Sequence, residues 1–155
     1  GKGGDKYDNI RIGINGRMDT LQAAILLEKF TIFPEEVCLR NEVANRYTRL
    51  MSANQKLTFP AVPDDFTSVW AQYSVLAKDD DHRARIQSRL KEAGIPTAVY
   101  YPKPLHLQTA FQGLGYQSGD FPISEDFSNR IFSLPMHPYL SAADQEKIAQ
   151  LIHQM

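Results

Sequence analysis

The sequence predicts an α+β fold in which two N-terminal helices are followed by a small antiparallel sheet packed with helices. Two observations lead to this prediction. Residues 19–51 carry apolar side chains at helical spacing, whereas short runs of strand-like residues alternate with helical segments from residue 57 onward. The 155 residues are 43% hydrophobic and 23% charged, as in a globular chain with room for one domain of ordinary size.

The first helix is predicted to begin after Asp19 and to run to about Phe30, behind a glycine-rich loop over residues 1–18. Gln22 stands three positions after Asp19, as in a capping box. The helix is apolar on most of its sides and so needs cover on every side, which a chain of this size is not expected to supply. A second helix of roughly five turns is predicted from Pro34, which suits the first helical position.

The remaining elements follow from changes in hydrophobic period and from turn residues. Strands are predicted over residues 57–62, 70–77, 97–101 and 131–134. Asp81 is expected to cap a helix that Gly94 ends, and Ser141 to cap the terminal helix. Further helices are predicted over residues 106–111 and 122–129.

Several classes of function are not expected. A net charge of −1 without a basic stripe argues against nucleic-acid binding, and no apolar run approaches the length of a membrane span. The single cysteine provides neither a disulfide framework nor a thiolate metal site, and the cytoplasm is the expected compartment. The four histidines lack the spacings of zinc ligands, so no metal is expected: His82, His106, His137 and His153.

The first candidate site is the loop over residues 13–19, immediately before the first helix. Backbone N–H groups and the positive end of a helix make such a position suitable for an anion. The Asn15 amide could donate to a phosphate oxygen, and the Arg17 guanidinium could bind a carboxylate or a phosphate. The pattern alone favours the alternative, an ordinary turn with a solvated arginine.

The second candidate site is the segment over residues 100–106. It brings two phenols, Tyr100 and Tyr101, together with Lys103 and His106, on a backbone stiffened by two prolines. Aromatic rings and hydroxyls of this kind can line a sugar or nucleotide pocket. Taken alone, the segment favours the alternative, a strand end with half-buried tyrosines, and the residues by themselves indicate no reaction.

Taken together, these segments resemble the DegT/DnrJ/StrS family of sugar aminotransferases, which are fold-type I enzymes that use pyridoxal phosphate (PLP). The first part of the family pattern is matched by Gly13, Asn15, Arg17, Met18, Asp19, Gln22, Ala23 and Ala24. The later matches, spread over nearly the whole chain, are Gly94, Ile95, Pro96, Thr97, Tyr101, Pro102, Pro104, Leu105, His106, Gln108, Phe121, Pro122, Glu125, Ser133, Leu134, Pro135, His137 and Pro138.

The resemblance implies that this is the C-terminal portion of a longer enzyme, as does the start of the chain within a glycine-rich loop without an initiating Met. Residues 1–33 would be the end of the large domain, with a loop and a buried helix, and residues 34–155 the C-terminal small domain. None of the eight lysines stands where the family has its Schiff-base lysine, so we expect this chain alone to be inactive. The lysine would hold PLP and move a proton during transfer.

The resemblance also assigns roles residue by residue. Asn15 would contact the PLP phosphate of the neighbouring subunit, and Arg17 would face the substrate sugar, where an arginine suits a carboxylated ring. Tyr100 and Tyr101 would line the sugar pocket, although Tyr100 stands at a position where members that act on uronic acid sugars can have His. His106 would lie near the nucleotide sugar. The implied enzyme is a homodimer with shared active sites that passes an amino group from glutamate to a keto-sugar nucleotide, for surface polysaccharide or glycan synthesis.

Three alternatives stay open at this point. A PLP-dependent sugar dehydratase of the same family would carry a histidine in place of the lysine. A free-standing non-catalytic module would use the apolar helix over residues 21–27 to dimerise or to bind another protein. A regulatory role is the third, and the neutral charge argues against binding to DNA.

Overall fold

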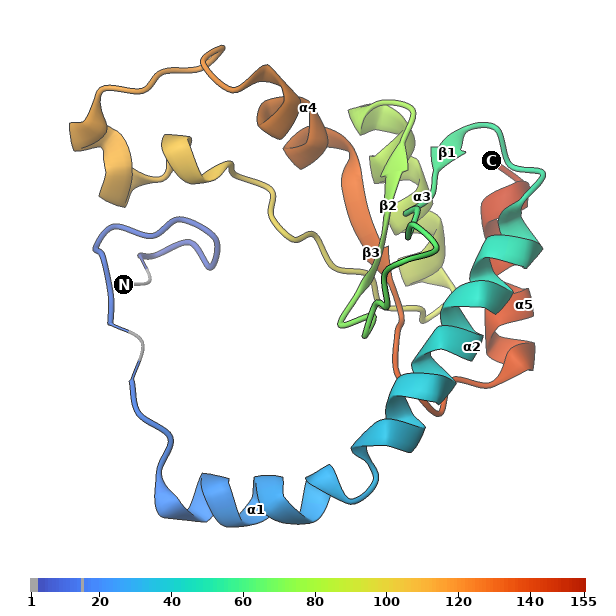
Figure 1. Cartoon of the computed structure of the whole chain (residues 1–155). Helices are drawn as coiled ribbons and strands as arrows, with labels where there is room; N and C mark the ends of the chain where they lie inside the picture. Colours follow the sequence, from blue (N-terminus) through green and yellow to red (C-terminus); the bar gives the residue numbers. More distant parts are fainter. Residues whose placement is uncertain (1–2, 15) are drawn as a thin grey trace.

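The computed structural model describes residues 3–14 and 16–155, and it confirms the predicted fold class (Figure 1). Two helices come first, and a small antiparallel sheet with further helices follows. The elements in chain order are α1 (Thr20–Phe30), α2 (Phe33–Met51), β1 (Leu57–Thr58), β2 (Tyr73–Ala77), α3 (Asp80–Glu92), the 3₁₀ turns η1 (Leu105–Leu107) and η2 (Thr109–Leu114), α4 (Pro122–Arg130), β3 (Ile131–Leu134) and α5 (Ala142–His153).

The sheet has the order β1-β2-β3 with antiparallel neighbours throughout. Tyr73 pairs with Leu134, and Leu57 pairs with Ala77. Alternate residues of β2 are buried, as expected of a strand with one face on the core. β1 and β2 are both shorter than predicted.

The strand predicted over residues 97–101 is wrong. Only Ala98 pairs there, through two backbone hydrogen bonds with Ser133 of 3.2 and 2.7 Å. Pro96 limits the pairing on one side: it lies two residues before Ala98, at the next hydrogen-bonding position of the ladder, and has no N–H to donate. The chain then leaves the edge of the sheet at Tyr100 and continues into the segment over residues 100–106, the second candidate site.

The core lies between the sheet and the helices α2, α3 and α5. The predicted stripe of α2 is buried at Val43, Ala44, Tyr47 and Met51. The Tyr47 hydroxyl donates to the Pro135 carbonyl at 3.0 Å, which satisfies a polar atom inside the apolar core. The buried side chains from the other elements are Leu57, Tyr73, Val75, Ala77, Ile86, Leu90, Ile95, Phe132, Leu134, Ile148, Ala149 and Ile152.

The helix caps are confirmed in two cases and corrected in one. The Asp19 and Gln22 side chains form both bonds of a capping box at α1, and Ser141 caps α5. The cap of α3 is Asp79 rather than Asp81, with its carboxylate accepting from the His82 N–H at 2.7 Å. Three consecutive aspartates can each cap a helix, and the chain leaves β2 in an extended conformation that places the first of them at the helix start.

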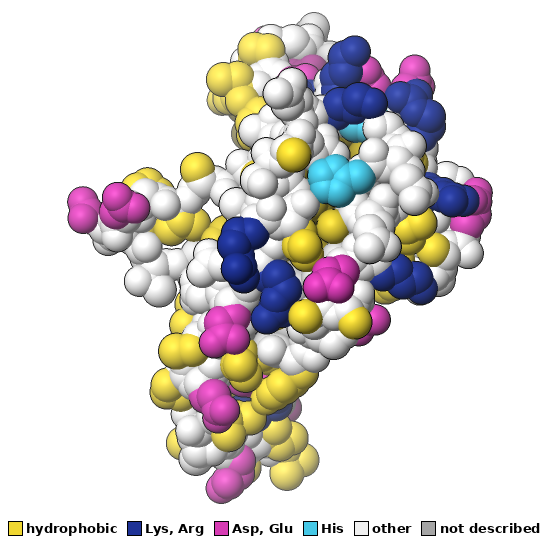
Figure 2. All heavy atoms as spheres, turned by 90° about the vertical axis from the view of Figure 1, so that its right-hand side faces the viewer, with side chains coloured by type: hydrophobic (Ala, Val, Ile, Leu, Met, Phe, Trp, Pro, Cys, Tyr) yellow, Lys and Arg dark blue, Asp and Glu magenta, His cyan; other side chains and the backbone are white. Residues whose placement is uncertain are grey.

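Helix α1 is apolar on most of its sides, and in the described chain none of its residues is buried. Leu21 is 79% exposed and Leu27 is 68% exposed. Figure 2 shows hydrophobic side chains gathered over the lower part of the molecule, where α1 lies in Figure 1. The start of α2 is the neighbouring element, and the Phe30 and Phe33 rings meet there at 6.0 Å between centroids. Cover for this helix, as expected, does not come from the described residues.

The N-terminal loop before α1 returns to a distant part of the sequence. It lies beside η1 and η2, so that the ribbon traces an open ring (Figure 1). A backbone hydrogen bond of 2.7 Å joins the Ala110 N–H to the Asn9 carbonyl across this contact. The N-terminal loop is therefore hydrogen-bonded to η2.

Candidate functional site

The candidate site is a groove of about 630 Å³ between the segment over residues 100–105 and the region around α4. Most of its lining is apolar. Pro104, Leu105 and Phe121 contribute to its walls, and the Lys103 and Asp120 side chains add charge at its rim. A concave surface with apolar walls and a few polar groups is typical of small-molecule sites.

Tyr100 and Tyr101, predicted to contact a sugar, both line this groove. They are 38% and 64% exposed, and their rings meet edge to face at 5.8 Å between centroids. The peptide bond between them is cis. The pair is therefore placed where a ligand in the groove would contact it, and its role in binding stays a prediction.

His106 lies in the next hollow, of about 310 Å³, which adjoins the groove at Leu105, Phe121 and Ser124. Its side chain is only 7% exposed, and Nε2 lies 3.0 Å from a Glu125 carboxylate oxygen. The ring also lies against Phe121, with 4.8 Å between centroids. His106 is thus already engaged within the chain, and its predicted contact with a nucleotide sugar stays a prediction.

The two residues predicted from the loop over residues 13–19 do not join the groove in this chain. Asn15 lies outside the described residues. Arg17 is exposed, and its guanidinium has no hydrogen bond or ion pair among the described residues. Its charge is therefore available to a ligand or to a part of the protein beyond this chain.

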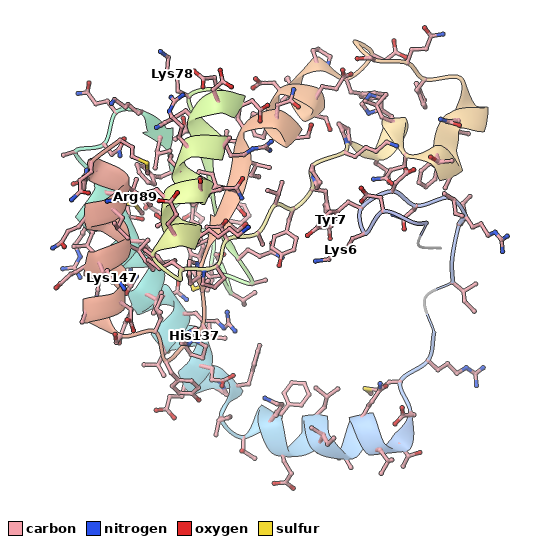
Figure 3. The ribbon with its side chains drawn as sticks, turned by 180° about the vertical axis from the view of Figure 1, so that it is seen from behind. Lys6, Tyr7, Lys78, Arg89, His137 and Lys147 are labelled. Carbon is pink, nitrogen blue, oxygen red and sulfur yellow. The ribbon has the colours of Figure 1, made fainter. Side chains whose placement is uncertain are left out.

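The structure adds residues of the N-terminal loop that the sequence analysis did not identify. Lys6 and Tyr7, labelled in Figure 3, line a hollow of about 260 Å³ together with Tyr101 and Lys103. The Tyr7 ring meets the Tyr101 ring edge to face at 6.3 Å, and the Lys6 ammonium lies 4.8 Å from the Tyr7 ring centroid. No local pattern signals the contact between Tyr7 and Tyr101, because the two residues are more than 90 positions apart.

No three His, Cys, Asp or Glu side chains among residues 3–14 and 16–155 come together in a way that could hold a metal ion. Within the same residues, no helix has the length and apolar character needed to cross a membrane.

Comparison with known proteins identifies the family. The family model of the DegT/DnrJ/EryC1/StrS aminotransferases matches residues 1–153. The chain belongs to this family. A curated relative, the UDP-2-acetamido-2-deoxy-3-oxo-D-glucuronate aminotransferase of Pseudomonas aeruginosa, is 44% identical over 138 residues, which are 89% of this chain and 36% of that protein. The predicted family resemblance is confirmed.

Solved structures of family members have the same fold. An aminotransferase of the family from Brucella abortus is 46% identical, with a TM-score of 0.79 over 99% of this chain and 40% of that one. DesV of Streptomyces venezuelae, solved with a ketimine intermediate, is 26% identical, with a TM-score of 0.83 over 98% of this chain and 40% of that one. The chain thus spans about two fifths of the length of these relatives.

Aminotransferases of this family depend on PLP, and structural neighbours have been solved in PLP and pyridoxamine phosphate forms. A PLP site needs a lysine whose amine can lose its proton to form an imine. Lys103 is held by Asp8 in an ion pair, and the contact with Tyr7 raises the pKa of Lys6. Neither Lys6 nor Lys103, the two lysines beside the groove and its adjoining hollow, is therefore a free amine suited to that role.

Proposed function

We propose that this chain is the substrate-facing part of a PLP-dependent aminotransferase that transfers an amino group from glutamate to the keto group of a nucleotide sugar. The observation that carries the proposal is the 44% identity to an aminotransferase of a UDP-linked 3-oxo sugar acid. The groove supports it, because aromatic side chains that can pack against a sugar ring line its walls. The lysine that holds PLP would come from the part of the protein outside this chain. The reaction would take place in the cytoplasm, and its product would enter surface polysaccharide or glycan synthesis.

The groove suits one wall of a sugar site. A sugar ring has an apolar face that packs against aromatic side chains, while its hydroxyls bond to polar groups. Tyr100 and Tyr101 offer both features, and Phe121 extends the apolar surface. In this proposal the groove positions the sugar and excludes water, and His106 borders the nucleotide end.

The sugar is proposed to carry a carboxylate. The Pseudomonas aeruginosa relative is named for a glucuronate substrate, and Arg17 offers an exposed guanidinium without a partner among the described residues. A planar guanidinium can bind a carboxylate through two parallel hydrogen bonds, which a lysine cannot reproduce. Members that act on uronic acid sugars can have His at the position of Tyr100, so in this proposal a tyrosine takes that place beside the sugar.

The active enzyme is proposed to be a homodimer with shared sites. Asn15 would reach the PLP phosphate of the partner subunit, and Arg17, two residues later, would come with it. The exposed apolar face of α1 shows that the described chain leaves a large surface without cover. Isolated from the rest of the enzyme, the chain is expected to form no reducible imine with PLP and to transfer no amino group.

The test uses the full-length enzyme and two keto-sugar nucleotides that differ only in a carboxylate or a hydroxymethyl group on the ring. We expect glutamate-dependent amination of the carboxylated sugar. Arg17→Lys should lower kcat/KM for that sugar by roughly 30-fold, as loss of a charge-assisted fork costs about 2 kcal/mol. The uncharged sugar should be affected much less, and the control Arg49→Lys, at an exposed position of α2, should change neither.

Each alternative gives its own result. Loss of water from the sugar without amino transfer would indicate the dehydratase. If the full-length protein carries the lysine and yet turns over no sugar, the remaining alternative is the non-catalytic interaction module. Equal losses on both sugars in Arg17→Lys would reject the carboxylate assignment while leaving the aminotransferase in place.

A further inference from the structure

Asp8 connects the N-terminal loop to the start of η2 and to the groove. Its Oδ1 lies 2.8 Å from the Lys103 ammonium and accepts from the Thr109 N–H at 3.1 Å, while Oδ2 accepts from the Thr109 hydroxyl at 2.7 Å. One carboxylate therefore joins three donors across 95 to 101 residues of sequence. Hydrogen bonds to a charged group are stronger than those between neutral groups.

The buried side chain of Gln108 also connects the N-terminal loop to the segment that lines the groove. It is only 4% exposed, and its carbonyl oxygen accepts from the Asn9 N–H at 2.7 Å. Its amide donates to the Tyr7 carbonyl at 2.8 Å and to the Lys103 carbonyl at 3.2 Å. Both ends of the amide are thus used, and the side chain joins the backbones of the loop and of residue 103. Asp8 and Gln108 together are called the clasp below.

The clasp ends at the wall of the groove. Tyr7, whose carbonyl it holds, places its ring against Tyr101, which lines the groove. Lys103, which it holds at both the ammonium and the carbonyl, lines the groove and also the smaller hollow beside Tyr7. Two groove-lining residues, Tyr101 and Lys103, therefore depend on the clasp for their positions relative to the loop.

The Asp8 carboxylate of the clasp keeps its charge throughout the neutral pH range. The bonds from Lys103 and Thr109 lower the pKa of Asp8 to about 2 from its ordinary 3.8. The carboxylate is therefore ionised throughout the neutral range, and Lys103 keeps its partner. The clasp is a fixed support rather than a pH switch.

We propose that the clasp of Asp8 and Gln108 is a positioning device for the substrate, which holds the N-terminal loop against residues 101–110 so that Tyr101 forms a fixed wall of the sugar groove. This inference rests on the proposed function. Asp8 and Gln108 are positioning residues, because they act through Tyr101 and Lys103 rather than on the reacting atoms.

The two halves of an amino transfer separate this role from a general structural one. Glutamate is too small to need a wall built for a nucleotide sugar, so its half-reaction does not depend on the clasp. The keto-sugar nucleotide fills the groove and does depend on it. Loosening the clasp therefore weakens binding of the sugar nucleotide and leaves the transfer from glutamate unchanged.

The experiment compares Asp8→Asn and Thr109→Val with the unmodified full-length holoenzyme. Asp8→Asn keeps the size of the side chain but removes the charge that holds Lys103, and Thr109→Val removes one hydroxyl bond. We expect Asp8→Asn to raise KM for the keto-sugar nucleotide about tenfold and Thr109→Val to raise it about threefold, with kcat changed less than twofold. The glutamate half-reaction, followed by cofactor absorbance in single-turnover experiments, should keep its rate.

Hydrogen exchange and a control variant complete the experiment. Amide hydrogen exchange should speed up at residues 7–10 and 108–110 in both variants, because the Asn9 and Ala110 amides donate within this contact. Asp65→Asn, which removes an exposed carboxylate from another loop, should change neither exchange at these residues nor KM.

The outcomes are distinct. Faster exchange with an unchanged KM for the sugar nucleotide overturns the proposal, because the clasp then supports only the loop. Equal losses in both half-reactions also overturn it, since they indicate a general structural defect. An unmodified enzyme that accepts glutamate but aminates no keto-sugar nucleotide refutes the proposed function itself, and the assignment of the clasp to sugar binding falls with it.

Discussion

The imidazole of His106 and the carboxylate of Glu125 meet at 3.0 Å between Nε2 and Oε1, and both side chains are mostly buried. The same carboxylate accepts from the Ser118 hydroxyl at 2.8 Å and from the Gly119 N–H at 2.8 and 3.0 Å. These bonds, led by the one from Ser118, lower the pKa of Glu125 below its ordinary 4.5. The Glu125 carboxylate thus ties the turn before α4 to the ring that borders the candidate nucleotide end of the groove.

Replacement of this carboxylate by an amide should loosen the turn. In Glu125→Gln the new NH₂ group cannot accept from the Gly119 N–H, so at least one of the five contacts of the side chain places two donors against each other. We expect a lower midpoint of thermal unfolding and faster hydrogen exchange at residues 117–121. Glu146→Gln, at an exposed position of α5, should change neither. Unaltered exchange in Glu125→Gln would show that the other contacts hold the turn.

A buried hydroxyl in the core provides a second test. Tyr47 is fully buried, and its hydroxyl donates to the Pro135 carbonyl at 3.0 Å. Tyr47→Phe leaves that carbonyl without its partner, so we expect a loss of about 1–2 kcal/mol in the free energy of unfolding. Tyr139→Phe removes an exposed bond to Glu36 and should cost less than about 0.5 kcal/mol. Urea unfolding of the two variants measures the difference, and equal losses would contradict the assigned burial.

The fold could be predicted from the sequence because its signals are local. Helical spacing of apolar residues marked α2, and side-chain caps marked the starts of α1 and α5. The strand predicted over residues 97–101 was wrong although its residue types favour a strand, because Pro96 has no N–H with which to extend the pairing beyond Ala98. The cap of α3 was misplaced among three aspartates, which no local rule distinguishes.

The candidate site could be predicted in part for the same reason. Tyr100, Tyr101 and His106 stand within seven residues, and the structure places them in adjoining hollows. The clasp was not found, because Asp8 meets Lys103 and Thr109 across about two thirds of the chain. A carboxylate near the N-terminus has no property in the sequence that distinguishes it from a solvated surface charge.

A pH dependence of stability is expected from His82. The imidazole is buried, Nδ1 accepts from the Lys78 N–H at 3.3 Å, and burial together with the positive charge of Arg85 lowers the pKa of His82 below its ordinary 6.5. The folded state thus favours the neutral ring, so the unfolded state binds more protons below about pH 6.5. This contribution to stability is complete above that pH and is lost as the pH falls toward the folded-state pKa.

His82→Asn tests this contribution, because an amide oxygen can accept from the Lys78 N–H without titrating. Between pH 7.5 and pH 5.5 we expect the unmodified chain to lose more of its free energy of unfolding than the variant does. His137→Asn, which replaces an exposed histidine labelled in Figure 3, should follow the unmodified chain. If the free energy of unfolding falls equally with pH in His82→Asn and in the unmodified chain, His82 is not the source of the pH dependence.

Helices α1 and α5 both begin at a residue whose side-chain oxygen caps the helix, but α1 is exposed. Asp19 and Ser141 each accept from a backbone N–H in the first turn, at 2.8 and 3.1 Å. α5 packs into the core, whereas in the described chain α1 has no buried residue. Loss of a cap costs about 1 kcal/mol, but that cost reaches the cooperative unfolding of the core only where the helix is part of it.

Ser141→Ala should therefore lower the free energy of unfolding of the core by about 1 kcal/mol. Asp19→Ala should leave it unchanged and should instead speed hydrogen exchange over residues 22–30. Both are measured on the 155-residue chain at a concentration low enough to keep it monomeric, because self-association through α1 would couple that helix to the core. A loss of core stability in Asp19→Ala as large as that in Ser141→Ala would mean that α1 packs against the rest of the chain in solution.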